Sequence, residues 1–393
     1  MTDALHAALL PEGFYDVLPP EAAQEAAVIE RMMTVLGGHG YDRVKPPLVE
    51  FEDTLLSGVG ASMARHTFRL MDPMGSRMLG LRADMTVQIA RIARSRLAAA
   101  ERPLRLAYAG QVMQVRGTQL RPERQFAQVG AELIGGAQPA ADAEAALLAV
   151  EALQAVGVDR LALDLTEPTL VPALLGAHGV EGEAGTALRH ALDRKDAAAI
   201  AQHGGAAAVA LGALLAASGP ADAALAALAG IDLPAVTRPL LDRLAEVVRR
   251  IRASAPELMV TVDFVEHRGF EYHSGVAFTR FARGARGEVG RGGRYRANGA
   301  EGEEATGFTL YMDTVLRAAT PSTAPRRAFL PFGTAHGAGA PLREVGYVTI
   351  AGLEPGADPL VEARRLGCGW VLRDGRPCRV ADLEAETGHP AKL

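Results

Sequence analysis

The stretch that decides the fold is AYAGQVMQVRGTQLRPERQFAQVGAELIG, residues 107–135. Two apolar runs, 105–116 and 125–134, flank a loop that carries Arg116, Arg121 and Arg124. Apolar and small residues alternate with polar ones in both runs, which is typical of strands with one face in a core. The stretch therefore predicts two paired strands, and its arginines raise the question of whether the loop holds an anion.

The elements around this pair alternate between helical and extended patterns. Helical periodicity and end signals predict helices over 19–40, 86–97 and 139–157. Extended patterns predict strands at 41–51, 160–167 and within 259–281, and a hairpin over 67–82. Farther on, we expect a glycine- and arginine-rich loop at 283–299 and a helix over 305–319. Pro46 and Pro47 place the strand at 41–51 at a sheet edge or a dimer seam.

Between about 168 and 255 the strand signals stop, and alanine, leucine and glycine dominate. Antiparallel strands interrupted by such a helical insertion favour an α+β fold over a doubly wound sheet. A proline-rich joint at 320–327 separates the first domain, 1–320, from a short tail of α/β character at 321–393.

Composition excludes several classes of protein. The chain has 393 residues, 49% of them hydrophobic, and a net charge of −5. A protein that grips nucleic acid usually carries a basic excess, so this role is disfavoured. The only lysines are Lys45, Lys195 and Lys392, and none of them lies in a phosphate-binding loop motif.

Signals for metals, disulfides and membranes are also missing. Cys368 and Cys378 are too few for a disulfide framework or a four-cysteine zinc site, and no two histidines are spaced i,i+4. The N-terminus lacks a secretory signal pattern, and the most apolar segment, 204–219, is rich in alanine and glycine. We therefore expect a cytoplasmic protein with no cofactor, no metal and no membrane partner.

Six motifs occur together in one order: PEGFYDVLPPEA, YDRVKPPLVE, LRADMT, the strand pair 105–135, VEHRGFEYHSG, and GGRY followed by TGF. In this order and spacing the sequence resembles the catalytic domain of class II histidyl-tRNA synthetases over about residues 11–318. The resemblance implies an antiparallel sheet flanked by helices, and dimerisation through the segment around Pro47.

The nucleotide half of the family's site departs from the pattern. The synthetases hold ATP with an arginine and a glutamate in the second motif and an arginine in the third motif. The matching positions here are Gln114, Arg116 and Thr314, and Tyr311 replaces a glycine. Phosphate chemistry needs fixed cations, so the resemblance implies that the ATP site is lost.

The amino-acid half matches better. The family's ammonium-binding acid and threonine correspond to Asp84 and Thr86, and its residues that read the polar end and the imidazole ring correspond to Gln128 and Glu132. The arginine and first tyrosine of its next motif correspond to Arg268 and Tyr272, while its second tyrosine is His273 here. The resemblance implies a histidine pocket built from these seven residues.

Each of these residues also fits a purely structural role. Gln128 and Glu132 fit as paired polar groups on a strand, and Asp84 fits as a helix cap. Arg268 fits as a surface ion pair with Glu266 or Glu271. For Arg121 and Arg124, we expect loop charges surrounded by solvent.

A synthetase-like domain with an amino-acid pocket but no ATP site resembles the regulatory subunits of ATP phosphoribosyltransferase, a family of histidyl-tRNA synthetase paralogues. The resemblance implies a short-form catalytic partner, a role in the first step of histidine biosynthesis, and feedback inhibition by histidine. It also implies that no residue of this chain is catalytic. The alternatives are a working histidyl-tRNA synthetase and a non-enzymatic binding module.

Overall fold

The chain forms two compact units, Met1–Thr320 and Pro321–Leu393. The computed structural model describes residues 9–267, 269, 272–297, 302–321 and 324–387. Each unit is considered by itself below.

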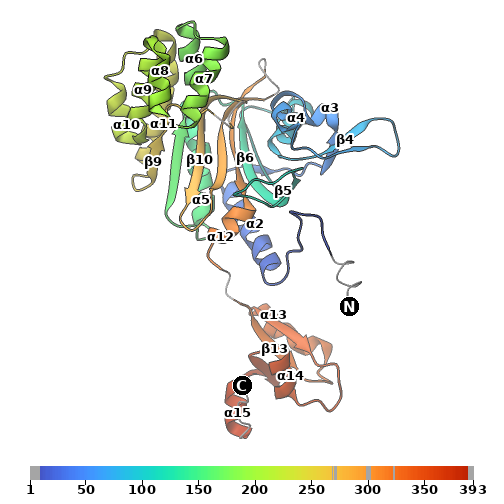
Figure 1. The fold of residues 1–393 in the computed structure, drawn as a ribbon. Coiled ribbons are helices and arrows are strands. Elements are labelled where there is room, and N and C mark those ends of the chain that lie inside the picture. Colours follow the sequence, from blue (N-terminus) through green and yellow to red (C-terminus); the bar gives the residue numbers. More distant parts are fainter. Residues whose placement is uncertain (1–8, 268, 270–271, 298–301, 322–323, 388–393) are drawn as a thin grey trace. The chain divides into compact units, whose positions relative to one another are not determined.

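A mixed sheet organises the first unit, and helices cover it (Figure 1). Within the described residues its nine strands lie in the order β1 (Asp42–Arg43), β5 (Leu104–Met113), β6 (Gln125–Ile134), β12 (Glu304–Tyr311), β11 (Glu288–Arg296), β10 (His273–Ala282), β7 (Leu161–Thr166), β9 (Met259–Val262) and β8 (Gly219–Pro220). Neighbours pair antiparallel except β1 with β5 and β7 with β9. The sheet is thus mostly antiparallel, with two parallel pairs that the sequence did not indicate.

The predicted strand pair lies at one side of this sheet. In β6, Ala127, Val129, Ala131 and Leu133 face the larger core, which also contains side chains of α2 (Glu21–Gly38), α5 (Pro139–Gln154) and α11 (Arg238–Ser254). The alternate residues face the smaller core beside α4 (Thr86–Ser95). Because side chains alternate along a strand, Gln128 and Glu132 point to the α4 face.

Two expectations for the end of the first unit are wrong. Residues 288–296 form the central strand β11 instead of a loop, and 304–311 form β12, so that only Met312–Ala318 (α12) is helical. The glycines of β11 weaken its strand signal in the sequence. They are needed because neighbouring atoms lie very close: a Cβ on Gly292 would lie 2.3 Å from the Phe278 ring. Pairing with β10 and β12, rather than local propensity, makes this segment a strand.

A small sheet and a helical insertion complete the first unit. The small sheet has the order β2 (Val49–Phe51), β4 (Met78–Leu81), β3 (Arg69–Met71), and it adjoins α3 (Glu52–Leu55) and the 3-10 helix Gly58–Met63. The insertion comprises α6 (Leu170–Ala177), α7 (Gly182–Asp193), α8 (Ala197–His203), α9 (Gly205–Ala217), α10 (Ala221–Leu228), the 3-10 helix Ala235–Thr237 and α11. Figure 1 shows α6 to α10 gathered at one end of the sheet.

The second unit has its own sheet and core. Its four described strands lie in the order β14 (Tyr347–Ala351), β13 (Arg326–Leu330), β15 (Trp370–Arg373), β16 (Arg376–Arg379). The helices are α13 (Ala340–Glu344), α14 (Pro359–Arg365) and α15 (Val380–Thr387), with the 3-10 helix His336–Gly339. Phe329, Ala363, Val371 and Leu383 form much of one core cluster.

No helix in the described parts of the chain has the length and apolar character needed to cross a membrane.

Candidate functional site

A small pocket opens on the α4 face of the large sheet. Its volume is about 130 Å³, and its walls come from the start of α4, from β10, β11 and β12, and from the segment before β10. The lining residues are Met63, Asp84, Thr86, Val87, Gly269, Tyr272, His273, Arg291, Thr309 and Tyr311. Four of the seven residues predicted to bind an amino acid therefore meet in one pocket: Asp84, Thr86, Tyr272 and His273.

Hydrogen bonds orient the Asp84 carboxylate at the pocket wall. Oδ1 accepts from the Thr86 backbone N–H at 2.8 Å, and Oδ2 accepts from Gln128 Nε2 at 3.0 Å. The other end of the Gln128 amide accepts from Met85 N at 3.2 Å. Asp84 thus does contact the first turn of α4, as the structural alternative supposed. Each oxygen nevertheless keeps a second lone pair, so the carboxylate still has acceptor capacity.

Glu132 lies one layer behind the pocket and is only 1% exposed. Its Oε1 accepts from Tyr108 Oη at 3.2 Å, and its Oε2 accepts from Tyr295 Oη at 3.0 Å. The side chain fits because the facing position in β12 is Gly307, where a Cβ would lie 1.8 Å from Oε2. Burial raises the pKa of Glu132 to about 8, although the hydroxyl donors partly oppose the shift. Burial therefore favours the protonated form of this carboxyl group over the charged form.

Hydroxyl groups link Glu132 to the pocket wall. Tyr108 Oη lies 2.8 Å from Thr309 Oγ1 and 3.3 Å from Thr86 Oγ1, and both threonines line the pocket. Burial raises the pKa of Tyr108 well above its usual value, with the Glu132 charge as the next cause. Tyr108 thus stays neutral and connects the buried acid with the cavity.

Aromatic rings and one arginine also line the pocket. The rings of Tyr272 and His273 lie 4.1 Å apart, and the rings of Tyr272 and Tyr295 lie 6.1 Å apart in an edge-on arrangement. The Arg291 guanidinium is paired with Glu288 and donates to the Gly269 carbonyl at 3.5 Å. Arg268, the predicted carboxylate ligand, lies outside the described residues.

The three positions that match the synthetases' ATP-binding residues place no arginine in this pocket. Gln114 Nε2 donates to the Ala83 carbonyl at 3.5 Å. Arg116 is exposed on the loop, and Thr314 is buried with its hydroxyl 3.4 Å from Asp313 Oδ2. None of the three is among the residues that line the pocket.

Arg121 corrects the expectation of a solvated loop charge. Its guanidinium carbon lies 3.7 Å from the centre of the Tyr311 ring, and its side chain is only 16% exposed. Nε lies 3.2 Å from Asp313 Oδ2, and Nη2 lies 3.4 Å from Glu288 Oε1. The loop does contain a fixed cation, but two carboxylates neutralise it and Tyr311 covers it.

Arg124 is a second correction. Its guanidinium lies 4.8 Å from the centre of the Phe14 ring and 5.1 Å from that of Phe68, and it donates to the carbonyls of Gln114 and Glu12. It therefore fastens the N-terminal segment to the strand pair.

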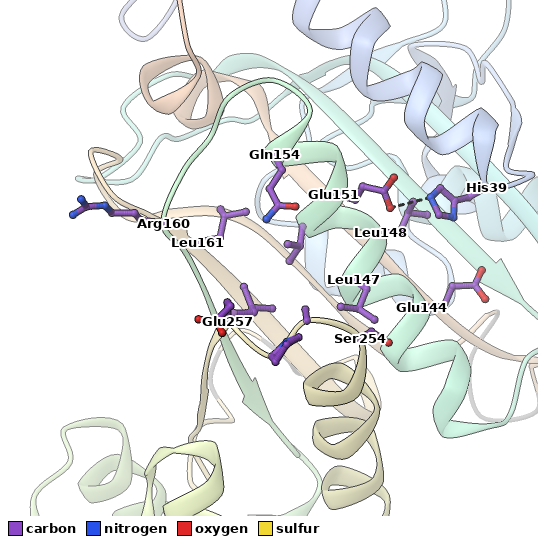
Figure 2. Close-up of a pocket in the computed structure, with 14 residues that line it drawn as sticks. His39, Glu144, Leu147, Leu148, Glu151, Gln154, Arg160, Leu161, Ser254 and Glu257 are labelled. Atoms are coloured by element: carbon purple, nitrogen blue, oxygen red, sulfur yellow. Dashed lines mark hydrogen bonds and ion pairs between the residues drawn. The ribbon is translucent and has the colours of Figure 1, made fainter.

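A larger pocket, of about 660 Å³, lies elsewhere in the first unit and is drawn in Figure 2. It runs between α5 and the end of α11, and the His39 ring lies 3.0 Å from Glu151 Oε2 at one side. Leu148 and Leu161 in its lining belong to the larger core, on the face away from α4. None of the residues predicted to bind an amino acid lines it.

Sequence reasoning missed Arg291 and Thr309 as lining residues. The available signal was their spacing: Arg291 shares a strand face with Tyr295, and Thr309 shares one with Gly307. The local sequence hides that signal, because it suggests a loop over 283–299 and a helix over 305–319 instead of β11 and β12. Among the described residues, no group of three or more metal-binding side chains is arranged to hold an ion.

Comparisons with known proteins give the family and the fold of this chain. The histidyl-tRNA synthetase family matches residues 13–315. ATP phosphoribosyltransferase regulatory subunits from Rhodospirillum centenum and Paramagnetospirillum magneticum are 56% and 54% identical, over 95% and 94% of this chain and 97% of each relative. A solved ATP phosphoribosyltransferase regulatory subunit/histidyl-tRNA synthetase from Bacillus halodurans has a TM-score of 0.79 at 23% identity, covering 93% of this chain and 97% of that one. The predicted class II synthetase-like α+β fold is thereby confirmed.

Proposed function

The chain belongs to the histidyl-tRNA synthetase family and, within it, to the regulatory subunits of ATP phosphoribosyltransferase; from this premise we propose that it binds histidine in the α4-face pocket and makes no histidyl-adenylate. It acts in the cytoplasm, in a complex with a short-form catalytic ATP phosphoribosyltransferase subunit. It relays feedback by histidine to that subunit, and it binds no nucleic acid.

The observation that supports this proposal most is the oriented Asp84 carboxylate at the pocket wall. Thr86 N–H and the Gln128 amide fix its direction, and both oxygens retain acceptor capacity. This arrangement suits the ammonium group of a free amino acid, because charge-assisted hydrogen bonds are strongest where the acceptor is fixed in advance.

Glu132 gives the pocket its preference for an imidazole. Each of its oxygens accepts one tyrosine hydroxyl and keeps a second lone pair. An imidazole N–H that enters between Thr86 and Thr309 is directed towards this acid and the hydroxyls around it. Tyr272 and His273 contact the ligand from the side, and Arg268 holds its carboxylate.

The nucleotide half supports the absence of adenylation. A synthetase must place cations against the α-phosphate while charge develops there. Gln114 is neutral, Arg116 is exposed, Thr314 is buried, and Arg121 is committed to Asp313 and Glu288. Tyr311 adds bulk where the related enzymes have a glycine.

An effect on ATP phosphoribosyl transfer requires the second polypeptide, because this chain supplies no catalytic group in the proposal. Feedback is then a coupling free energy between histidine and the active state of the complex, typically about 1–3 kcal/mol. Co-expression with a short-form catalytic subunit should give one co-eluting complex whose activity exceeds that of the catalytic subunit alone and falls when histidine is added. Separate elution together with unchanged activity would reject the proposal.

Self-association is a further part of the proposal. The carbonyls of Pro46 and Pro47 accept from Arg82 and Gln88, which fixes the segment predicted to form the dimer seam. Next to it, apolar side chains are exposed at Leu48 and, in the small sheet, at Phe51, Leu70, Met71 and Met78. Sedimentation equilibrium of the chain tests this: we expect a dimer, and a dimer weakened by Phe51→Glu. A monomer at micromolar concentration would contradict it.

A further inference from the structure

The helical insertion and the ligand pocket are joined through one short segment, Asp263–His267, between β9 and β10. Two residues beyond this segment, Gly269 lines the cavity and its carbonyl accepts from Arg291. Within the segment, the Glu266 carbonyl accepts from Thr166 Oγ1 of β7 at 2.7 Å. On the insertion side, the junction of α7 and α8 holds the segment through ion pairs.

Lys195 makes two of these contacts. Its Nζ lies 2.5 Å from Asp263 Oδ2 and 3.7 Å from Glu266 Oε2. A third contact joins Asp193, at the end of α7, to His267 Nε2 at 3.5 Å. Three contacts from one helix end thus reach both ends of the segment.

The backbone at Lys195 indicates that its side chain is there for a reason. The Asp196 N–H donates to the Ala191 carbonyl and the Lys195 N–H donates to Leu192, which is a Schellman cap with Lys195 at the left-handed position. Its φ is 54°, a conformation that glycine adopts at no steric cost and a lysine adopts only with strain.

Composition strengthens this argument. The chain has 43 glycines, and its basic residues are almost all arginines. Yet this helix cap, where glycine is the usual residue, carries one of the three lysines. Helix termination alone does not explain a lysine here, whereas its two carboxylate contacts do.

We propose that Lys195 is a positioning residue: it clamps segment 263–267 to the insertion, so that the segment holds the pocket wall at Gly269 in its ligand-binding arrangement. This inference rests on the proposed histidine binding. If the ion pairs of Lys195 raise the affinity for histidine, histidine binding stabilises those ion pairs by the same free energy. The clamp therefore couples the insertion to the ligand.

Lys195→Gly is the decisive variant, because glycine is better than lysine at this cap and the fold should not suffer. We expect its melting temperature to equal or slightly exceed that of the parent. We expect the affinity for histidine, measured by calorimetry on the full chain, to fall about three- to ten-fold, since a partly exposed ion pair contributes modestly to the competent population. Lys195→Arg keeps the charge and should recover most of the affinity.

The matched control is Arg238→Ala, which removes an exposed ion pair with Asp242 in the same insertion but away from the segment. It should leave affinity unchanged. Hydrogen exchange of the unliganded chain provides a second readout: amides of 263–267 should exchange faster in Lys195→Gly and not in Arg238→Ala.

The outcomes separate the two proposals. If the parent binds histidine and Lys195→Gly shows parental affinity and exchange, the clamp is wrong and the proposed function stands. If the parent binds no histidine, the proposed function fails. Exchange alone then decides whether Lys195 fixes the segment: faster exchange supports the clamp and parental exchange overturns it. A large drop in the melting temperature of Lys195→Gly would also overturn it, because the lysine would then be needed for folding.

Discussion

The two halves of the pocket region differ in how their charges are satisfied. In the amino-acid half, Asp84 is held by an amide and a backbone N–H and faces an open cavity. In the nucleotide half, Arg121 is stacked on Tyr311 and paired with Asp313 and Glu288. One half therefore keeps an anion with unused acceptor capacity, whereas the other has used its cation internally. A binding site depends on charges left available to a ligand, and by this criterion the Asp84 side of the region suits a charged ligand better than the Arg121 side.

Glu132→Gln should have the largest effect on the amino-acid half. Losing a charge-assisted hydrogen bond at a desolvated site costs about 1.5–3 kcal/mol, so histidine affinity should fall roughly ten- to a hundred-fold. The free energy of unfolding should rise at pH 7 by about 1–3 kcal/mol. Because the pKa of Glu132 is raised, the folded chain binds a proton that the unfolded chain releases at this pH, and glutamine removes that cost.

The stability of the parent chain should depend on pH through Glu132. Glu132 has a pKa of about 8 in the folded chain and a lower one when unfolded, so its contribution to stability declines as the pH rises from about 4.5 to 8. Glu144→Gln is the control: hydrogen bonds from Arg105 and Tyr41 outweigh burial and lower the pKa of Glu144, so this change should destabilise the fold and leave histidine binding intact. If Glu132→Gln binds histidine like the parent, the ligand lies elsewhere.

The pH profile of histidine binding should be bell-shaped. One proton shared by Glu132, with a pKa of about 8, and an imidazole, with a pKa of about 6.5, gives highest affinity between those two values. Outside this window a proton must be released or taken up, so affinity should fall about ten-fold per pH unit. Calorimetry across pH 5.5–9.5 measures this. In Glu132→Gln the decline that begins near pH 8 should disappear; its persistence would mean that another group titrates.

Arg121→Ala tests whether the nucleotide half is now a structural element. The change removes the stacking on Tyr311 and leaves Asp313 buried without its cation, so the unfolding free energy should fall by about 1–2 kcal/mol. Histidine affinity should change less than three-fold. Urea denaturation and calorimetry measure the two quantities. Unchanged stability with ATP binding lost would show that Arg121 still serves a nucleotide.

Arg116→Ala should have the smallest effect. This arginine is exposed, whereas Arg121 on the same loop is enclosed. Stability should stay within about 0.5 kcal/mol of the parent, as is usual for surface substitutions. Activation of the catalytic subunit should be unchanged as well. A loss of activation would assign Arg116 to the interface with the partner.

The fold was predictable where alternation and helix signals are local. Residues 125–134 show their two faces in the sequence itself, and the helix at 19–40 has clear start and stop signals. Residues 288–296 do not, because their strand character comes from pairing with β10 and β12 and their glycines accommodate neighbouring side chains.

The site was predictable only in part, for the same reason. Asp84 and Gln128 were identified as separate residues, but their hydrogen bond joins positions 44 residues apart. The partners of Arg121 are at 288, 311 and 313, far along the chain, so its loop sequence alone suggested a solvated charge. Only the folded chain brings these distant residues to Arg121, so the sequence around the loop could not predict that its charge is neutralised.

The most direct test of the central claim compares the two ligands on one sample. The purified chain is titrated calorimetrically with histidine and, separately, with ATP and magnesium, and histidine-dependent pyrophosphate exchange is measured on the same preparation. We expect saturable histidine binding, no ATP binding and no exchange. ATP binding together with exchange at a rate typical of a synthetase would contradict it, because the nucleotide half would then be intact.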